Sequence, residues 1–188
     1  ANFHSPNGIT TDGTNLYVSD TYNHLIRQVV ISSRVVTTIA GTGSSGSSNG
    51  TGTSARFYYP WGITTDGTNL YVVDNSNRLI RKIVISTGVV TTIAGSGTCS
   101  STDGTGQEST FCGTQDITTD GTNLYVADGN KIRRIVISTG VVTTIAGSGS
   151  AGGVNGTGSS SSFWGTKGIT TDGTNLYVAD GNKIRKIE

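Results

Sequence analysis

Short clusters of apolar residues alternate with polar, Gly-rich stretches along the whole chain. Between residues 62 and 95, β-branched and other apolar residues gather at 63–65, 70–73, 79–85 and 89–94, with turn residues between them. Apolar clusters of this length favour strands rather than amphipathic helices. The Asp66-Gly67 pair between the first two clusters is a hairpin signal. The pattern therefore predicts four sequential strands joined by tight turns, an antiparallel meander.

The meander is repeated. The segment Ile-Thr-Thr-Asp-Gly-Thr-Asn-Leu-Tyr-Val opens at Ile9, Ile63, Ile117 and Ile169, with spacings of 54, 54 and 52 residues. Such a period marks an array of supersecondary units, and meanders repeated around an axis form a β-propeller. We predict an all-β propeller with three complete four-stranded antiparallel blades and three strands of a fourth. The blades are expected at about 8–41, 62–95, 116–147 and 168–188 of a single array over 1–188.

One tripeptide in the repeat points to a known family. The first copy reads Asn23-His24-Leu25 where the others have Asn77-Arg78-Leu79, Asn130-Lys131-Ile132 and Asn182-Lys183-Ile184. Together with the Leu-Tyr-Val-x-Asp, Ile-Arg-x-Ile and Val-Val-Thr-Thr-Ile-Ala-Gly segments, the chain resembles NHL-repeat β-propellers of the bacterial, secreted type. The resemblance covers essentially the whole chain and implies blades that usually close as a ring of six. The fourth copy ends after its third strand, so we expect a longer native chain or completion by a neighbouring molecule.

Charge and hydropathy argue against several kinds of partner. The chain has 13 Lys and Arg against 12 Asp and Glu, so no basic field attracts nucleic acid or an anionic membrane. No apolar run approaches the roughly 20 residues of a membrane-spanning helix. The sequence opens at Ala1-Asn2-Phe3 without Met, and we expect a processed or trimmed chain.

Cys99 and Cys112 bracket one Gly-, Ser- and Thr-rich loop. They are either two free thiols or a disulfide that closes the loop, and the second reading is favoured because neither has a metal-ligand partner nearby. A disulfide places the protein in an oxidising compartment. We therefore expect an exported bacterial protein, extracellular or on the cell surface.

Variation among the copies collects in the second turn and in the connection that precedes each copy. In an up-and-down blade these two segments lie on one face, opposite the shared Asp-Gly-Thr-Asn turn. Loop drift explains such variation; so does a recognition face, because aromatic residues there suit interfaces and carbohydrate stacking. The candidate contact residues are Tyr22, His24, Tyr58, Tyr59, Trp61, Trp164 and Lys167. A Phe recurs in the connection as an expected buried anchor, at Phe3, Phe57, Phe111 and Phe163.

Most acidic residues recur once per copy. One set opens the first turn (Asp12, Asp66, Asp120, Asp172) and the other follows the second strand (Asp20, Asp74, Asp128, Asp180). Asp in such turns bonds local backbone amides, and the second set faces a recurring arginine (Arg27, Arg81, Arg133, Arg185) with which it can pair. A ring of carboxylates binding a cation is the alternative, but structural repetition already accounts for one Asp per copy. We expect structural roles and no metal site.

Catalytic chemistry has little support in the sequence. His4 and His24 occupy different repeat positions, a poor basis for a zinc site or an activated nucleophile. We expect no enzymatic activity, no cofactor, no nucleic-acid partner and no membrane insertion. Asn49 and Asn155 begin glycosylation sequons. Because Asp103 occupies the same repeat position, a turn requirement explains both Asn residues equally well.

The sequence thus favours a non-catalytic extracellular binding or adhesion scaffold whose loop-rich face contacts protein or glycan. The alternative is a structural subunit of an extracellular oligomer or filament, in which chains complete one another by strand donation at the unfinished fourth copy.

Overall fold

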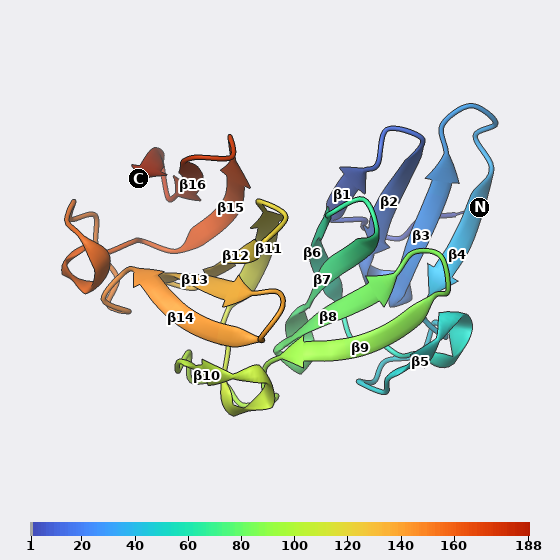
Figure 1. Cartoon of the computed structure of the whole chain (residues 1–188), viewed down its shortest axis with the longest axis horizontal. Coiled ribbons are helices and arrows are strands. Elements are labelled where there is room, and N and C mark those ends of the chain that lie inside the picture. The colour runs from blue at the N-terminus through green and yellow to red at the C-terminus, as the bar shows by residue number, and fades with distance from the viewer. Residues whose placement is uncertain (1) are drawn as a thin grey trace. The chain divides into compact units, whose positions relative to one another are not determined.

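The computed structural model describes residues 2–188. The chain divides into two compact units, Ala1–Ile93 and Ala94–Glu188, and each unit contains two small antiparallel sheets (Figure 1). The only helical elements of the described residues are five 3-10 turns of three residues. The all-β prediction is therefore confirmed, as are three blades of four consecutive strands and a fourth sheet of three. The expectation of a single array over 1–188 stays a prediction.

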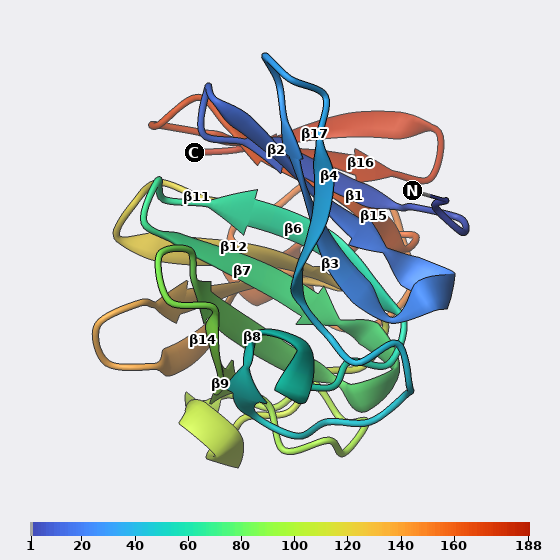
Figure 2. The same cartoon turned by 90° about the vertical axis from the view of Figure 1, so that its right-hand side faces the viewer.

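The first unit contains blades 1 and 2. Blade 1 is formed, in sheet order, by β1 (Gly8–Thr11), β2 (Asn15–Asp20), β3 (Leu25–Val30) and β4 (Val36–Ala40). Blade 2 is formed by β6 (Pro60–Thr65), β7 (Asn69–Asp74), β8 (Leu79–Val84) and β9 (Val89–Ala94). Its outer edge gains β5 (Gly50–Thr51) from the connection between the blades. The 3-10 turns are η1 (Thr21–Asn23), η2 (Gly52–Ser54) and η3 (Asn75–Asn77). The two sheets lie side by side (Figure 2).

The second unit contains blades 3 and 4. Blade 3 is formed by β11 (Thr114–Thr119), β12 (Asn123–Asp128), β13 (Lys131–Val136) and β14 (Val141–Ala146), with β10 (Gly104–Thr105) paired to β14. Blade 4 is formed by β15 (Thr166–Thr171), β16 (Leu176–Asp180) and β17 (Lys183–Ile187). The 3-10 turns are η4 (Gly106–Glu108) and η5 (Gly158–Ser160). The short edge strands β5 and β10 were not predicted, since their Gly-Thr pairs carry no apolar pattern.

The shared first turn explains why every copy begins with the same hairpin. Oδ1 of Asp66 accepts hydrogen bonds from the backbone N–H groups of Thr68 and Asn69, at 2.8 and 2.6 Å. Its Oδ2 accepts one from the Tyr71 hydroxyl at 2.8 Å. Although burial raises the pKa of Asp66, these donors hold it below its ordinary value. The same contacts recur around Asp12, Asp120 and Asp172, so the predicted local role of this Asp set is confirmed.

Each unit buries its apolar core between its two blades. Successive strand residues point to opposite faces, so in β7 one face carries Leu70 and Val72, both fully buried. In the first unit these meet Tyr17, Ile26 and Ala40 of blade 1. The second unit repeats the arrangement with Ala127, Ile132 and Ala146 of blade 3 against Phe163, Ile169, Leu176 and Val178 of blade 4. Each of these two cores is therefore formed jointly by the two blades of its unit.

An ion pair links the second and third strands of every blade, and its Asp is fully buried in each. The Arg–Asp nitrogen-to-oxygen distances are 3.5 Å for Arg27–Asp20, 2.8 Å for Arg81–Asp74, 3.0 Å for Arg133–Asp128 and 3.1 Å for Arg185–Asp180. Each guanidinium also lies over the recurring Phe, 4.9–5.6 Å from the ring centre, within the range of a cation–π interaction. The predicted pairing of the second Asp set with Arg is confirmed.

The expected burial of the recurring Phe holds for three of the four copies. Phe57 and Phe111 are 0% exposed and Phe163 is 1% exposed, whereas Phe3 is 38% exposed. Phe57 and Phe163 are covered by the preceding blade of their own unit. The prediction was wrong for Phe3, because no described strand of the first unit packs on that face of blade 1.

Candidate functional site: an aromatic surface in the first unit

In every blade the residue after the recurring Phe is fixed through its main chain. The backbone N–H of His4, Tyr58, Cys112 or Trp164 donates to Oδ1 of the buried Asp of its blade, at 2.8, 2.8, 2.8 and 2.6 Å. The other oxygen of that carboxylate belongs to the Arg pair. Because these contacts use only the backbone of the residue after the Phe, that residue has the same place in every blade whatever its side chain.

In the first unit these backbone contacts hold residues whose aromatic rings form a cluster. His4 and Tyr22 have ring centres 5.1 Å apart, Tyr22 and Tyr59 5.0 Å, and Tyr59 and His24 4.9 Å. Tyr58 stacks on Tyr59 at 4.9 Å with an interplanar angle of 29°. All four separations between ring centres suit favourable aromatic contacts. We call this cluster, together with the adjacent Trp61, the aromatic surface; its residues are His4, Tyr22, His24, Tyr58, Tyr59 and Trp61.

The aromatic surface combines residues from two blades. Tyr22 lies in η1 of blade 1 and His24 follows that turn, whereas Tyr58 and Tyr59 lie in the connection that enters blade 2. Tyr22 is 52% exposed and Tyr58 38% exposed, while Tyr59 and Trp61 are half-buried. Five of the seven predicted contact residues are thus neighbours. His4 was missed, although its place after the recurring Phe was visible in the sequence.

His24 ties the two blades together through a polar contact. Its backbone is left-handed, with φ 57°, and its Nδ1 accepts a hydrogen bond from the Tyr59 backbone N–H at 3.2 Å. Accepting at Nδ1 requires that nitrogen to be unprotonated, so the ring proton of the neutral form is on Nε2. Burial lowers the pKa of His24 below its ordinary value. The neutral imidazole is therefore the form that supports the Tyr59 backbone.

Tyr59 itself has an unusual backbone. Its φ is +52°, and the residues at the same repeat position in the other blades, Ser5, Gly113 and Gly165, also have positive φ. A bulky side chain in this region is an outlier and costs about 1–2 kcal/mol relative to a relaxed conformation. Blade 2 thus has an aromatic ring at a repeat position where the other three blades have none.

A pocket opens beside these rings. It has a volume of about 360 Å³ and is lined by Ser5, Asn7, Thr21, Tyr22, Tyr59, Trp61 and Asn75. The Asn7 amide donates to the Thr21 hydroxyl at 3.0 Å, and that hydroxyl donates to the Pro60 carbonyl at 2.7 Å. The pocket therefore has aromatic walls and a floor of amide and hydroxyl groups, which are suited to an uncharged, hydroxyl-bearing ligand.

No family model matches the chain. Over 94 residues it is 36% identical to the NHL repeat-containing protein 2 of Gallus gallus, a match that covers 49% of this chain and 13% of that protein. A solved structure from Bacteroides thetaiotaomicron, described as a protein of unknown function, has a TM-score of 0.79 at 26% identity. It is matched over 96% of this chain and 46% of its own. The chain is an NHL-repeat β-propeller protein.

The NHL-repeat chain spans only part of the proteins that it matches. It covers 50% of an auxiliary nutrient binding protein from Bacteroides ovatus, with a TM-score of 0.72 at 18% identity, a similarity that shows the fold alone. The match to the chicken protein is confined to a small share of that longer chain. Activities and partners of the larger proteins therefore do not transfer directly.

The remaining predicted contact residues lie in the second unit of the NHL-repeat chain. Trp164 is 64% exposed and occupies the position that Tyr58 has in blade 2. Its indole lies beside Gly153. Lys167 is exposed at the start of β15. Neither residue is part of the aromatic surface described above.

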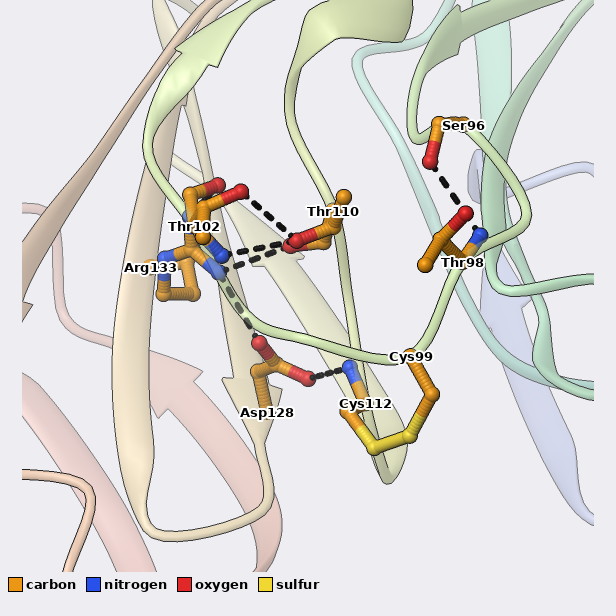
Figure 3. The surroundings of a disulfide bond; sticks show 8 residues. All are labelled: Ser96, Thr98, Cys99, Thr102, Thr110, Cys112, Asp128 and Arg133. Atoms are coloured by element: carbon orange, nitrogen blue, oxygen red, sulfur yellow. Dashed lines mark hydrogen bonds and ion pairs between the residues drawn. A yellow bond between two sulfur atoms is a disulfide. The ribbon is translucent and has the colours of Figure 1, made fainter.

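A disulfide joins Cys99 and Cys112, with Cα atoms 4.5 Å apart, in agreement with the prediction (Figure 3). It lies next to the blade 3 ion pair, because the Cys112 N–H donates to Asp128. Arg133 also donates to the carbonyls of Thr102 and Thr110, at 2.7 and 3.0 Å. The disulfide therefore closes a loop whose other contacts hold the Arg133 guanidinium.

The two sequon residues, Asn49 and Asn155, occupy the same repeat position as Asp103. Oδ1 of Asn49 accepts from Arg81 at 2.9 Å and from the Thr92 hydroxyl at 3.3 Å. Asp103 does the same for Arg133 and Thr144. This clamp of Arg and Thr was not recognised in the sequence, where the residues appeared only as a turn. Asn155 is exposed at the corresponding place in the second unit. Glycosylation at either Asn stays a prediction.

Residues 2–188 contain no cluster of three His, Cys, Asp or Glu side chains placed to hold a metal ion. Within the same range, no helix has the length and apolar character needed to cross a membrane.

Proposed function

We propose that this NHL-repeat chain is a non-catalytic binding module that takes a glycan on its aromatic surface. The observation that carries the proposal is Tyr59, an aromatic residue held at positive φ where blades 3 and 4 have Gly113 and Gly165 and blade 1 has the small Ser5. Strain of this kind persists where the surrounding structure supports it, and it clusters at ligand sites. The His24 hydrogen bond to the Tyr59 backbone supplies that support here.

The chemistry of the surface suits a sugar better than a charged ligand. The tilted rings offer flat faces for stacking, and Ser5 and Asn7 line the adjoining pocket with hydrogen-bonding groups. Binding sites commonly combine aromatic walls with a few polar groups that orient the ligand. The description of the Bacteroides ovatus neighbour as a nutrient binding protein is consistent with such a role. A protein partner is the other outcome that the experiment below distinguishes.

An extracellular or cell-surface location of a bacterial, exported protein is part of the proposal. Its support is the Cys99–Cys112 disulfide, since disulfides persist mainly in oxidising compartments. Measuring the thiol content of the protein isolated from its native cells tests this point. Free thiols at both positions would contradict export.

The test is a glycan array probed with the wild-type chain and two matched variants. Trp61→Ala removes a ring of the aromatic surface and its pocket, whereas Trp164→Ala removes an exposed ring of the other unit. We expect Trp61→Ala to lose the bound glycans and Trp164→Ala to retain them. A wild-type chain that binds no glycan but captures a protein through the same rings would replace the glycan by a protein ligand. Equal glycan binding by the wild type and both variants would show that the aromatic surface is not the glycan site.

Absence of catalysis is likewise proposed, on the grounds that the two His residues serve the aromatic surface. His24 accepts from the Tyr59 backbone and His4 packs on Tyr22. Elemental analysis of the purified chain checks the related expectation that no stoichiometric metal is bound. A metal present at one equivalent would contradict it.

A second candidate function is assembly with other copies, and two exposed blade faces favour it. Ile9 of blade 1 is 62% exposed, although its equivalents Ile63 and Ile169 are 5% and 6% exposed. Ile9 lies in an apolar hollow of about 350 Å³ that also includes Phe3, Leu16, Val18 and Val29. On blade 4, Ile184 is 73% exposed, whereas its equivalents Ile26 and Ile132 are fully buried by the next blade of their units.

These two faces match the pairs that already pack inside each unit. The blade 4 face that carries Ile184 is equivalent to the face of blade 1 that packs on blade 2. The blade 1 face that carries Ile9 is equivalent to the face of blade 2 that packs on blade 1. Head-to-tail contact between copies therefore repeats a packing that the chain uses twice. Light scattering of the wild type and of Ile184→Lys tests it, with a larger species expected only for the wild type. A monomer at all concentrations would exclude assembly.

A further inference from the structure

The Tyr59 ring of the aromatic surface depends on a single side-chain acceptor in the neighbouring blade. Nδ1 of His24 accepts a hydrogen bond from the Tyr59 backbone N–H at 3.2 Å. The centre of the Tyr59 ring lies 5.0 Å from that of Tyr22, and both rings line the pocket that also includes Trp61. His24 itself does not line this pocket. Its effect on a ligand in the pocket therefore passes through Tyr59.

The place of the His24 ring is fixed by its own blade and by Tyr58. The backbone of His24 ends η1 in the left-handed region, and its N–H donates to the Thr21 carbonyl at 3.2 Å. The Tyr58 ring meets the imidazole edge-on, with the ring centres 5.6 Å apart and an interplanar angle of 75°. Since backbone and packing hold the ring, its protonation state decides whether Nδ1 can accept.

Protonation reverses the role of Nδ1. In the imidazolium form both ring nitrogens are donors, so an N–H of His24 then faces the N–H of Tyr59. The φ of Tyr59 is +52°, a conformation that costs about 1–2 kcal/mol for a bulky residue. Such strain persists only where the surroundings support it. Gly113 and Gly165 adopt positive φ without this cost, so only the ring of blade 2 needs the acceptor.

No ion pair of the described residues includes His24. The titratable groups that face its ring are the phenols of Tyr58 and Tyr59, from the connection that enters blade 2. The buried carboxylates of the two adjoining blades, Asp20 and Asp74, are each paired with the Arg of their own blade. The imidazole therefore has no carboxylate partner that would hold a proton on it.

Burial is the main influence on the protonation of His24. It lowers the pKa of the imidazole below its ordinary value, and the Thr21 carbonyl acts in the opposite direction with a smaller effect. The neutral form that supports Tyr59 is accordingly the form present at neutral pH, and acidification produces the imidazolium. The hydrogen bond to Tyr59 is thus made at neutral pH and lost in acid.

We propose that His24 is a positioning residue of the glycan site, and that its protonation in mildly acidic solution releases Tyr59 and with it the bound glycan. The inference rests on the proposed function for the identity of the ligand. Apparent affinity follows the fraction of chains in the binding-competent form, so it should fall about tenfold for each pH unit below the folded pKa of His24. By reciprocity, bound glycan should lower that pKa.

The first experiment compares the wild type with His24→Asn on an array of neutral oligosaccharides at about pH 7.5 and about pH 5. Asn tolerates the left-handed backbone, and its amide oxygen is an acceptor that does not titrate in this range. The wild type should lose about tenfold or more in apparent affinity at the lower pH. His24→Asn should bind at both pH values, within about twofold.

Two other titratable groups of the site are controlled in the same experiment. Burial raises the pKa of Asp74 to about 6, and this carboxylate accepts from the Tyr58 N–H, but it is present in both proteins. The ring of His4 packs on Tyr22, so His4→Phe serves as a second variant and should keep the acid response of the wild type. Loss of the response in His4→Phe would assign the release to His4 and overturn the inference.

The second experiment needs no ligand. In NMR spectra of the 188-residue chain labelled with ¹⁵N, the backbone amide of Tyr59 should shift with the same midpoint as the His24 ring nitrogens. In His24→Asn this shift of the Tyr59 amide should be absent. A Tyr59 amide that ignores the His24 titration, or equal acid release of glycan by the wild type and His24→Asn, would overturn the inference. A coupled titration without glycan binding at any pH would support the role of His24 and refute the glycan.

Discussion

Asp74 and Arg81 form an ion pair with both side chains fully buried, and Nη1 lies 2.8 Å from Oδ2. The carboxylate also accepts the backbone N–H of Tyr58 and the amide of Asn77, each at 2.8 Å. One Asp therefore connects the interior of blade 2 to a residue of the aromatic surface. A change inside the blade is expected to reach the surface through this contact.

Asp74→Ala should lower the free energy of unfolding by about 3–5 kcal/mol, because it leaves the Arg81 guanidinium buried without its partner. The measurement is chemical denaturation followed by circular dichroism. The double variant Asp74→Ala/Arg81→Met should be less destabilised than Asp74→Ala alone, since it removes the unpaired charge. A double variant as unstable as the sum of two single variants would contradict a coupled pair.

Tyr59→Gly should separate stability from binding. Gly relaxes the left-handed backbone, which offsets the packing lost with the ring, so the free energy of unfolding should change by less than about 1 kcal/mol. The affinity for the bound glycan should nevertheless fall at least tenfold, because Tyr59 contacts Tyr22, His24 and Tyr58. Calorimetry of folding and of binding on the same preparation checks both. Unchanged affinity would remove Tyr59 from the site.

The stability of the first unit should depend on the protonation of His24. The folded pKa lies below the unfolded value of about 6.5, so the contribution is fully present above this pH. As pH falls below about 6.5, the unfolded chain takes up the proton first and stability declines until the folded pKa is passed. His24→Asn tolerates the left-handed backbone and should show a smaller decline.

This pH experiment compares how the stability of the wild type and that of His24→Asn change with pH. Asp74, whose pKa burial raises to about 6, is present in both proteins, and its titration therefore cancels to first order. Denaturation at intervals between pH 5 and 8 supplies the two curves. Parallel curves would show that the His24 contact with Tyr59 does not respond to protonation.

The disulfide should stabilise the second unit. It closes a loop with a sequence separation of 13 residues, and a loop of this size contributes about 3 kcal/mol by restricting the unfolded chain. Cys99→Ser/Cys112→Ser should therefore unfold at lower denaturant concentration. Reductant should lower the midpoint of the wild type to that of the variant. A midpoint unaffected by reductant would mean that the bond contributes nothing.

Much of the fold was predictable because its causes are local or recur in every repeat. Asp66 bonds amides two and three residues away, so the Asp-Gly-Thr-Asn turn specifies itself. The pairing of Asp74 with Arg81 follows from adjacent strands of one meander. Even the variable face was predictable in part, since Tyr22, Tyr58 and Tyr59 fall where the copies differ. Their exposure was expected and the structure places them in contact.

Other features require contacts that no local pattern contains. Asn49 and Asp103 appeared as turn residues, yet each bonds an Arg and a Thr of the following sheet. His4 joins the aromatic surface only because the connection before blade 1 passes Tyr22. The strained backbone of Tyr59 could be suspected from Gly113 and Gly165 at the same position, but its His24 support lies in another blade.

By itself, the amino-acid order determined the strands, the hairpin turns, the once-per-repeat ion pairs and the loop that the cysteines bracket. These depend on alternation, turn chemistry and short separations along the chain. Only the tertiary structure decided which aromatic rings touch and that Ile9 and Ile184 are exposed while their equivalents in other blades are buried. The physical reason is that such contacts depend on blade packing and on backbone conformations of long connections, which residue patterns constrain only weakly.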